Sequence, residues 1–299
     1  MLSILIPTYN YNITNLVNDL HQQAEMLGIA FEIIVMEDGS QAFLEENQSV
    51  ESQHFVRRIV LTANIGRSAI RNRLAEEAKY DFLLFLDCDA EVDNVDFLKN
   101  YLSHCHKNTV TVGGTKYSVD NQPNKYSLRL KYGTEREATG KNFTTFNFLI
   151  PKEIFQTIRF DETIRTYGYE DLIFGYELKT NNIPILYIDN PLIHKGLDEN
   201  KVFLQKAETG IKNLYDLYQS GRYPFLSKES KILSFFATVR KYRLQTFILL
   251  LFRILTPIFA KNLTGKNPSL FLFDFYKLGY LCKNAKNNNN KPLSFLEHP

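Results

Sequence analysis

Hydrophobic residues in the first two thirds of the chain gather in short unbroken runs, with polar stretches between them. These runs predict strands at residues 2–6, 31–36, 56–61, 82–86, 110–114, 144–150 and 185–188. The runs lack the polar alternation of a half-solvated sheet, and they are typical of buried strands joined by crossover helices. The pattern therefore predicts an α/β domain with buried parallel strands and helices on both faces.

Helical patterns occupy the stretches between these runs. We expect helices at residues 13–27, 68–78 and 168–178, and another that begins at Pro151, because proline is well placed in a first helical turn. The polar stretch 120–141 is expected to consist of loops and a mobile excursion. A domain boundary is expected near Gly221, so that residues 1–220 form the α/β domain and residues 221–299 a helical C-terminal region.

Charge is spread unevenly along the chain. The whole chain has 35 Lys and Arg against 33 Asp and Glu, a net +2, which argues against a dedicated nucleic-acid binder. Residues 228–266 alone carry +7, so the remainder carries −5. Within 227–263, cations cluster between apolar residues at near-helical spacing, which is typical of a basic amphipathic helix that contacts a membrane surface. A helical lid on the catalytic domain and a dimer interface are the alternatives.

The cysteines and the N-terminus indicate a cytoplasmic protein. Cys88, Cys105 and Cys282 are odd in number and widely spaced, so they form neither a disulfide framework nor a thiolate metal site. The N-terminus lacks the basic region of a signal peptide, and its apolar run breaks at Pro7. Because no unbroken run reaches about 18 apolar residues, we expect no spanning helix. The expected location is the cytoplasm, at the inner face of the plasma membrane if the basic segment binds lipid.

Polar residues follow several predicted strands at the edge where α/β sheets bind ligands. Thr8 to Asn10, Asp38, Asn64 to Gly66, and Asp87-Cys88-Asp89 each come at such a strand end. An isolated Asp-Gly-Ser is usually a turn, but the ordered set is more specific. Two carboxylates flanking one residue repel each other unless a cation or hydrogen-bond donors offset the charge. Oxygen ligands suit Mg²⁺ or Mn²⁺, and a solvated acidic turn is the alternative.

In these motifs the chain resembles the family-2 glycosyltransferases of GT-A fold, over about residues 1–200. The resemblance rests on SILIPTYN, IIVMEDGS, NIGRSAIRNRLAEEA, FLLFLDCDAEV and YGYEDLIFGYEL, which occur in the family's order and at about its spacing. It implies a Rossmann-like domain with a mixed, mainly parallel sheet flanked by helices. Such a domain binds a nucleotide-diphospho-sugar together with a divalent cation. The C-terminal helical region lies beyond the resemblance.

The resemblance also implies roles for individual residues. Asp38 would hydrogen-bond the nucleotide base, and the loop residues Pro7, Thr8 and Tyr9 would pack on it. The Asp-Cys-Asp element would lie against the ribose and the diphosphate, with Asp87 and Cys88 toward the nucleoside and Asp89 on the metal. Arg71 matches an arginine near the nucleotide. Glu37 stands where the family often has an aspartate, and its role is left open.

A second motif, Tyr167-Gly168-Tyr169-Glu170-Asp171, supplies a candidate acceptor site. Glycosyl transfer with inversion needs a base beside the acceptor hydroxyl, and a carboxylate suffices. Glycine allows close approach, and tyrosine rings suit stacking on a sugar. The motif resembles the WGxED helix start of galactosyl- and N-acetylgalactosaminyl-transferring relatives, which implies Asp171 as the base and Glu170 as the acceptor contact. Ordinary first-turn acids favoured by the helix dipole are the alternative.

His194 follows a predicted strand, and relatives often place a metal ligand at this point. An imidazole ligand would favour Mn²⁺ over Mg²⁺; a capped loop histidine is an equal alternative. Lys116 and Lys195 would either neutralise the leaving diphosphate or lie at the surface.

Together these features predict an inverting, metal-dependent glycosyltransferase. It would move a hexose or N-acetylhexosamine from a nucleotide sugar, expected to be UDP-linked, to a glycan or lipid-linked sugar in surface polysaccharide synthesis. The alternatives are a non-catalytic carbohydrate-binding or scaffold subunit and a sugar-nucleotidyltransferase. The second of these would need an early glycine-rich basic loop, which the residues after the first strand do not provide.

Overall fold

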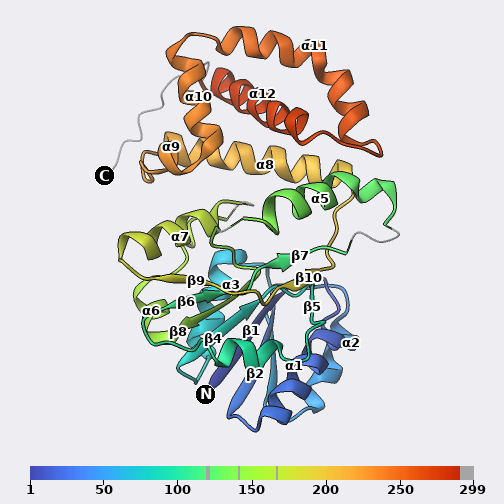
Figure 1. Ribbon diagram of the computed structural model, residues 1–299, viewed down its shortest axis with the longest axis vertical. Coiled ribbons are helices and arrows are strands. Elements are labelled where there is room, and N and C mark those ends of the chain that lie inside the picture. The colour runs from blue at the N-terminus through green and yellow to red at the C-terminus, as the bar shows by residue number, and fades with distance from the viewer. Residues whose placement is uncertain (119–121, 141, 166–167, 290–299) are drawn as a thin grey trace. The chain divides into compact units, whose positions relative to one another are not determined.

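The computed structural model describes residues 1–118, 122–140, 142–165 and 168–289 (Figure 1). The chain divides into two compact units. We call the first the α/β unit; it comprises Met1–Asp120, Gly133–Arg165 and Glu170–Leu197. The second, the helical unit, comprises Asn121–Tyr132, Thr166–Tyr169 and Asp198–Pro299.

The α/β unit is built on a 7-stranded sheet of order β3-β2-β1-β4-β8-β6-β9. Its strands are β1 (Leu2–Thr8), β2 (Phe31–Glu37), β3 (Val56–Val60), β4 (Phe82–Leu86), β6 (Val110–Val112), β8 (Asn147–Pro151) and β9 (Ile185–Tyr187). β8 runs antiparallel to its neighbours β4 and β6, and the other pairs are parallel. The predicted α/β class is confirmed, and every predicted apolar run supplies one strand of this sheet.

Helices cover both faces of the sheet. They are α1 (Thr14–Leu27), α2 (Leu44–Gln48), α3 (Arg67–Glu77), α4 (Phe97–Leu102), α6 (Lys152–Thr157) and α7 (Glu170–Thr180), with a 3₁₀ turn at Ser49–Ser52 and a π turn at Gly133–Glu137. Side chains alternate across β1. Ile4 joins the hydrophobic cluster that includes Leu20 of α1, whereas Leu5 joins the cluster that includes Leu74 of α3.

A small sheet of order β5-β10-β7 was not predicted. Its strands are β5 (Ala90–Glu91), β7 (Thr115–Lys116) and β10 (Leu192–His194), too short to give a periodic pattern. β10 pairs antiparallel with β5, and this places His194 opposite Ala90. The small sheet therefore brings His194 beside the Asp-Cys-Asp element.

The helical unit contains α5 (Ser127–Tyr132), α8 (Asn200–Gln219), α9 (Leu226–Glu229), α10 (Lys231–Lys241), α11 (Gln245–Leu263) and α12 (Leu270–Asn289), with a 3₁₀ turn at Asn124–Tyr126. Its core includes the buried residues Leu128, Phe203, Phe259, Leu263 and Phe273.

Part of the stretch expected to be loops is helical. α5 forms because Leu128 is buried in the core of the helical unit, and its backbone amide donates to Asn200 Oδ1 of α8 at 2.9 Å. The expectation of loops was wrong here, because a contact 72 residues away cannot be seen in the local pattern. α8 also groups with the C-terminal helices, so the compact units divide ahead of Asp198, whereas we expected a boundary near Gly221.

α11 also departs from expectation. With 19 residues and a mean hydropathy of 1.5 it is, among the described residues, a helix that could cross a membrane by length and composition alone. The helix contains no long unbroken apolar run, because Arg253 lies at its middle.

Candidate active site

The loops after β1 and β2 are tied to each other by Asn10. Its backbone amide donates to Ser40 Oγ at 3.0 Å, and its side-chain oxygen accepts the amides of Gln41 and Ala42. Pro7 and Thr8 lie within β1, where Thr8 is buried, whereas Tyr9 is 54% exposed. Of the three residues expected to pack on a base, Tyr9 is the one that offers an open ring.

Asp38 is buried and braces the turn that precedes α3. Its carboxylate accepts the backbone amides of Ile65 at 2.6 Å and Gly66 at 3.1 Å. Burial raises the pKa of Asp38, and these two hydrogen bonds oppose the rise. Gly39 has a φ of +70°, and a Cβ there would lie 2.6 Å from the amide nitrogen of Asn64, so the close approach requires glycine. The contact of Asp38 with a base stays a prediction.

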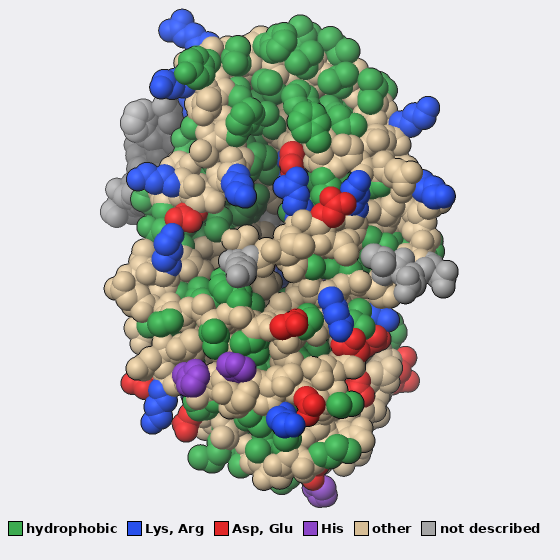
Figure 2. Space-filling view, viewed as in Figure 1, with side chains coloured by type: hydrophobic (Ala, Val, Ile, Leu, Met, Phe, Trp, Pro, Cys, Tyr) green, Lys and Arg blue, Asp and Glu red, His purple; other side chains and the backbone are tan. Residues whose placement is uncertain are grey.

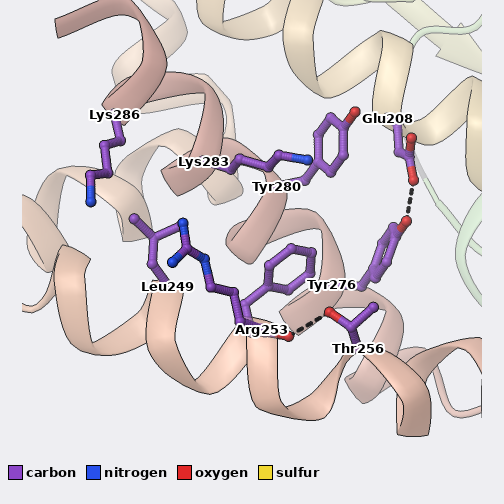
Figure 3. A pocket seen from close by; sticks show the side chains of 9 residues that line it. Glu208, Leu249, Arg253, Thr256, Tyr276, Tyr280, Lys283 and Lys286 are labelled. Atoms are coloured by element: carbon purple, nitrogen blue, oxygen red, sulfur yellow. Dashed lines mark hydrogen bonds between the residues drawn. The ribbon is translucent and has the colours of Figure 1, made fainter. Parts of the chain in front are cut away.

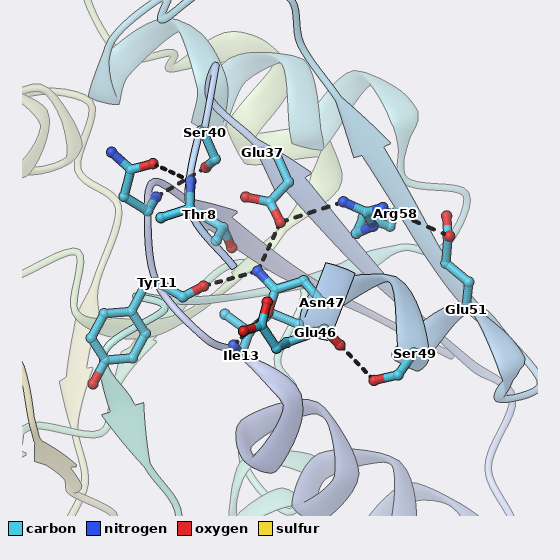
Figure 4. A network of polar contacts seen from close by, with 12 residues as sticks. Thr8, Tyr11, Ile13, Glu37, Ser40, Glu46, Asn47, Ser49, Glu51 and Arg58 are labelled. Atoms are coloured by element: carbon cyan, nitrogen blue, oxygen red, sulfur yellow. Dashed lines mark hydrogen bonds and ion pairs between the residues drawn. The ribbon is translucent and has the colours of Figure 1, made fainter. Parts of the chain in front are cut away.

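Glu37, whose role was left open, is fully buried and belongs to a polar network (Figure 4). It accepts from Asn47 Nδ2 at 2.8 Å and lies 3.7 Å from Arg58 Nη1. Asn47 in turn donates to the carbonyl of Tyr11 and accepts the amide of Ile13. Through Asn47, Glu37 therefore anchors the loop after β1.

Arg71 is also an internal residue. Its side chain is 3% exposed, with Nη2 2.5 Å from Asp87 Oδ1, and its guanidinium lies over the ring of Phe160 at 5.7 Å. The guanidinium fixes the orientation of Asp87. A direct contact of Arg71 with a nucleotide stays a prediction.

Asp89 and His194 face each other, with Oδ2 and Nε2 3.7 Å apart. The imidazole is stacked between the rings of Phe146 and Tyr117, with centroids at 5.1 and 5.4 Å. A Cβ on Gly196 would lie 2.0 Å from Asp89 Oδ2, so the absence of a side chain there makes room for the carboxylate. Burial raises the pKa of Asp89, while His194 and Arg67 lower it and Asp87 raises it.

The donor set at Asp89 fits a divalent cation that is completed by other ligands. Among the described residues no three His, Cys, Asp or Glu side chains converge as a metal site. A carboxylate and an imidazole are suitable ligands for Mn²⁺, and such ions often take their remaining ligands from substrate phosphates and water. Burial raises the pKa of the Cys88 thiol, which argues against a thiolate ligand.

Asp171 and Glu170 begin α7 at the same end of the sheet. The backbone amide of Thr145 donates to Asp171 Oδ2 at 3.2 Å, and its hydroxyl donates to Oδ1 at 2.9 Å. Burial, and then the charge of Glu170, raise the pKa of Asp171 to about 7, although Arg71 and the Thr145 amide oppose the rise. This carboxyl is therefore poised to take up a proton near neutral pH.

The carboxyls form one electrostatic cluster. Asp87 raises the pKa of both Asp89 and Asp171, so side chains from β4 and α7 act on the same region. Glu170 is buried; Oε1 lies 3.6 Å from Arg67 Nη1, and Oε2 has no hydrogen-bond partner among the described residues. The structure thus gathers Asp87, Asp89, His194, Glu170 and Asp171 as the sequence suggested.

Arg67 is the residue that the sequence reasoning missed. It is the first residue of α3, directly after Gly66, and its side chain is 54% exposed. It contacts Glu170 of α7 and also lowers the pKa of Asp89, which follows β4. Arg67 therefore acts on carboxyls from both elements. The available signal was its place at the start of the helix that follows β3, directly after Gly66.

The remaining candidates lie at the margin. Lys195 pairs with Glu91 at 3.0 Å and Lys116 pairs with Asp93, both partly exposed. Tyr167 lies outside the described residues. Gly168 and Tyr169 belong to the helical unit, where the Gly168 carbonyl accepts from Asn213 Nδ2 at 2.9 Å. Their contact with an acceptor stays a prediction.

Comparison with known proteins gives a family and several structures of similar fold. Residues 3–167 match the model of Glycosyl transferase family 2. No curated protein sequence matches the chain. A mannosyltransferase from Pyrobaculum calidifontis, solved with GDP-Man and Mn²⁺, is 12% identical with a TM-score of 0.62, over 97% of this chain and 88% of that one.

Two further structures are similar. TarS residues 1–349 from S. aureus, in complex with UDP-GlcNAc, is 18% identical with a TM-score of 0.51, over 95% of this chain and 88% of that one. Mannosyl-3-phosphoglycerate synthase from Rubrobacter xylanophilus is 15% identical with a TM-score of 0.51, over 74% and 75%. At these identities the likeness shows the fold, which is the GT-A-like α/β fold with a C-terminal helical region.

Proposed function

The chain belongs to glycosyl transferase family 2 and is a glycosyltransferase, and we propose that it transfers a hexose or N-acetylhexosamine with inversion from a UDP-linked sugar. The observation that carries the proposal is Asp171. A carboxyl with a pKa near 7, held by two hydrogen bonds from Thr145, lies in the same charge cluster as Asp87 and Asp89. Two of the similar structures were solved with nucleotide sugars, which supports a donor of this class.

Asp89 and His194 would hold a divalent cation, Mn²⁺ or Mg²⁺, together with the donor diphosphate. When bound, the cation supplies positive charge that stabilises the leaving nucleoside diphosphate. Asp87, oriented by Arg71, would contact the nucleoside side of the donor. Pro7, Thr8, Tyr9, Asp38 and Cys88 would line the same binding site, with Tyr9 offering its exposed ring.

Asp171 acts as the general base. It accepts the proton of the acceptor hydroxyl while that oxygen bonds to the anomeric carbon, and the bond from this carbon to the diphosphate breaks with its electron pair on the leaving group. With the base and the leaving group on opposite sides of the sugar, the anomeric configuration would invert. Glu170, which Arg67 contacts at 3.6 Å, would bind the acceptor.

We further propose a glycan or lipid-linked sugar as the acceptor, in surface polysaccharide synthesis. This proposal rests on the resemblance of the Glu170-Asp171 motif and on the basic, apolar C-terminal helices. It places the protein in the cytoplasm, at the inner face of the plasma membrane.

The test is a donor screen that needs no acceptor. The purified protein is incubated with a panel of UDP- and GDP-sugars and Mn²⁺, and nucleoside diphosphate release to water is measured with and without EDTA. We expect release from one UDP-sugar, its loss with EDTA, and a drop of about 10²-fold or more in Asp89→Asn. Asp81→Asn, an exposed surface aspartate, is the matched control. The proposal would be overturned if nucleoside diphosphate release were unchanged by EDTA and by Asp89→Asn, or if no donor gave release.

A further inference from the structure

A cavity of about 390 Å³ lies within the helical unit, between α11 and α12 (Figure 3). Arg253 of α11 and Lys283 and Lys286 of α12 line it, together with Tyr276, Tyr280 and Glu208. It plays no part in the transfer reaction proposed above, and the inference drawn from it goes beyond that reaction.

The cavity has an excess of positive charge. In the part of the chain that the structure describes, none of its three cations forms an ion pair, and Lys283 lies over the ring of Tyr280 at 5.2 Å. Glu208, the carboxylate of the lining, accepts a hydrogen bond from the Tyr276 hydroxyl. Three cations against one engaged carboxylate leave a net charge of about +2, which suits an anionic ligand.

The chemistry of the lining favours a phosphate. The planar guanidinium of Arg253 can bind two phosphate oxygens at once, and the lysines add point charges. A volume of a few hundred Å³ holds a phosphate with an attached small polar group. The aromatic rings of Tyr276 and Tyr280 and the buried Phe252 give the cavity an apolar wall.

α11 also carries a stripe of exposed apolar side chains. Its members recur every three or four residues and are between 55 and 62% exposed; they are Phe247, Leu250, Ile254 and Ile258. In Figure 2 hydrophobic side chains gather over α11, at the top of the view, with Lys and Arg side chains at the margins. An exposed apolar patch of this kind marks an interaction site.

We propose that the helical unit binds the surface of an anionic phospholipid bilayer, with a lipid phosphate in the cavity and the α11 stripe in the acyl region. The two faces of α11 then match the two ends of one lipid. Charge complementarity supports this occupant, because residues 228–266, which include α11, carry +7. Anionic lipid attracts such a segment, and the apolar stripe adds buried area.

A surface location also suits the way that α11 is packed. Phe252 and Phe259 are buried and contact Tyr276 of α12, so one side of the helix is occupied by protein. Arg253 at mid-helix remains exposed, where it can meet a headgroup. A helix that lies in the interface between bilayer and water can use both features. Arg253 then points toward the lipid phosphate, and the apolar stripe points toward the acyl chains.

The test is flotation of the full-length protein with vesicles of phosphatidylcholine alone or with 30% phosphatidylglycerol. We expect binding to the anionic vesicles, and a loss of about 100-fold in the triple variant Arg253→Gln, Lys283→Gln, Lys286→Gln. The matched control removes the same charge at exposed lysines of the same unit outside residues 228–266, Lys125→Gln, Lys201→Gln, Lys212→Gln, and should lose less than about threefold. Thermal melting verifies that both variants fold.

Stripe variants and extraction complete the test. Leu250→Ser with Ile254→Ser should weaken binding to the anionic vesicles about tenfold or more, because two exposed apolar side chains leave the acyl region. If both triple variants lost vesicle binding equally, the total charge of the protein would explain the binding, and the cavity site would be overturned. Protein that resists alkaline carbonate extraction would overturn a surface location in favour of a spanning α11. If the cavity triple variant loses glycerol 3-phosphate binding but keeps vesicle binding, the ligand of the cavity is a soluble phosphate instead.

Discussion

The candidate active site of the α/β unit and the cavity of the helical unit use their charged side chains in opposite ways. In the α/β unit charges are buried against one another, as in Glu37 with Arg58 and Arg71 with Asp87. In the helical unit Arg253, Lys283 and Lys286 surround a cavity without an ion pair among the described residues, beside exposed apolar side chains. Buried pairs fix geometry at a cost in desolvation, whereas exposed cations remain available to a ligand. The first arrangement suits a reaction site and the second a binding surface.

The largest expected effect comes from removing the proposed base of the α/β unit. Asp171→Asn should lower kcat by about 10²–10⁴-fold, because amide oxygen cannot accept the acceptor proton at neutral pH. Donor affinity should stay within about twofold, since Asp89 and His194, which lie 3.7 Å apart, and not Asp171 would hold the cation. Nucleoside diphosphate release and donor titration measure the two effects. Asp216→Asn, an exposed aspartate of the helical unit, controls for loss of a negative charge.

A glycine substitution tests the placement of Asp89. Gly196→Ala would put a methyl group 2.0 Å from Asp89 Oδ2, so the carboxylate must move. We expect Mn²⁺-dependent donor affinity to fall about 10–100-fold, as for other disturbed supports of metal ligands. Gly28→Ala, with a φ of +59° and no neighbour within 4 Å of the added carbon, should cost about 1 kcal/mol of stability and leave donor affinity unchanged. Equal donor affinity in both variants would contradict the assignment.

An arginine from each unit tests the comparison directly. Arg71→Met leaves Asp87 without its partner, and we expect a loss of about 2 kcal/mol, reduced by the partial exposure of Asp87. Arg253→Gln in the helical unit should change stability by less than about 0.5 kcal/mol, because its guanidinium has no ion pair among the described residues. Thermal and urea unfolding of both variants compares the losses. A larger loss for Arg253→Gln would break the comparison.

A pH-dependent gain in stability of Asp171→Asn tests the surroundings of the proposed base. The native pKa of Asp171, about 7, lies above its ordinary value of 3.8, so the native state binds this proton more tightly than the unfolded state. Its contribution to stability is full below about pH 4 and is lost as the pH rises to about 7. Asp171→Asn cannot ionise, so its melting temperature relative to the natural protein should rise between pH 5 and pH 8. A constant difference across that range would mean that Asp171 has an ordinary pKa.

The strands of the large sheet and the grouping of the acidic residues could be predicted from sequence. Unbroken apolar runs mark buried strands whatever their partners, and the residues after them meet at one sheet edge. That rule places Asp38, after β2, and Asp87 and Asp89, after β4, at the same edge of the sheet.

Features that depend on distant contacts could not be predicted. The burial of Arg71 could not be seen locally, because Phe160, whose ring its guanidinium overlies at 5.7 Å, lies far along the chain. His194 was left undecided because β5 and β10 are too short to show periodicity. The cavity in the helical unit depends on how α11 packs on α12, which helical spacing alone does not determine.

The pH dependence of donor hydrolysis tests the role of Asp171 most directly. For the donor identified by the screen, we expect kcat/KM for nucleoside diphosphate release to rise about tenfold per pH unit below pH 7 and to level off above it. Thr145→Val, which removes the hydroxyl that donates to Asp171 Oδ1 at 2.9 Å, should move the midpoint to higher pH, because that bond favours the charged form. A profile that is flat between pH 5 and pH 9, or a midpoint that stays unchanged in Thr145→Val, would contradict Asp171 as the base.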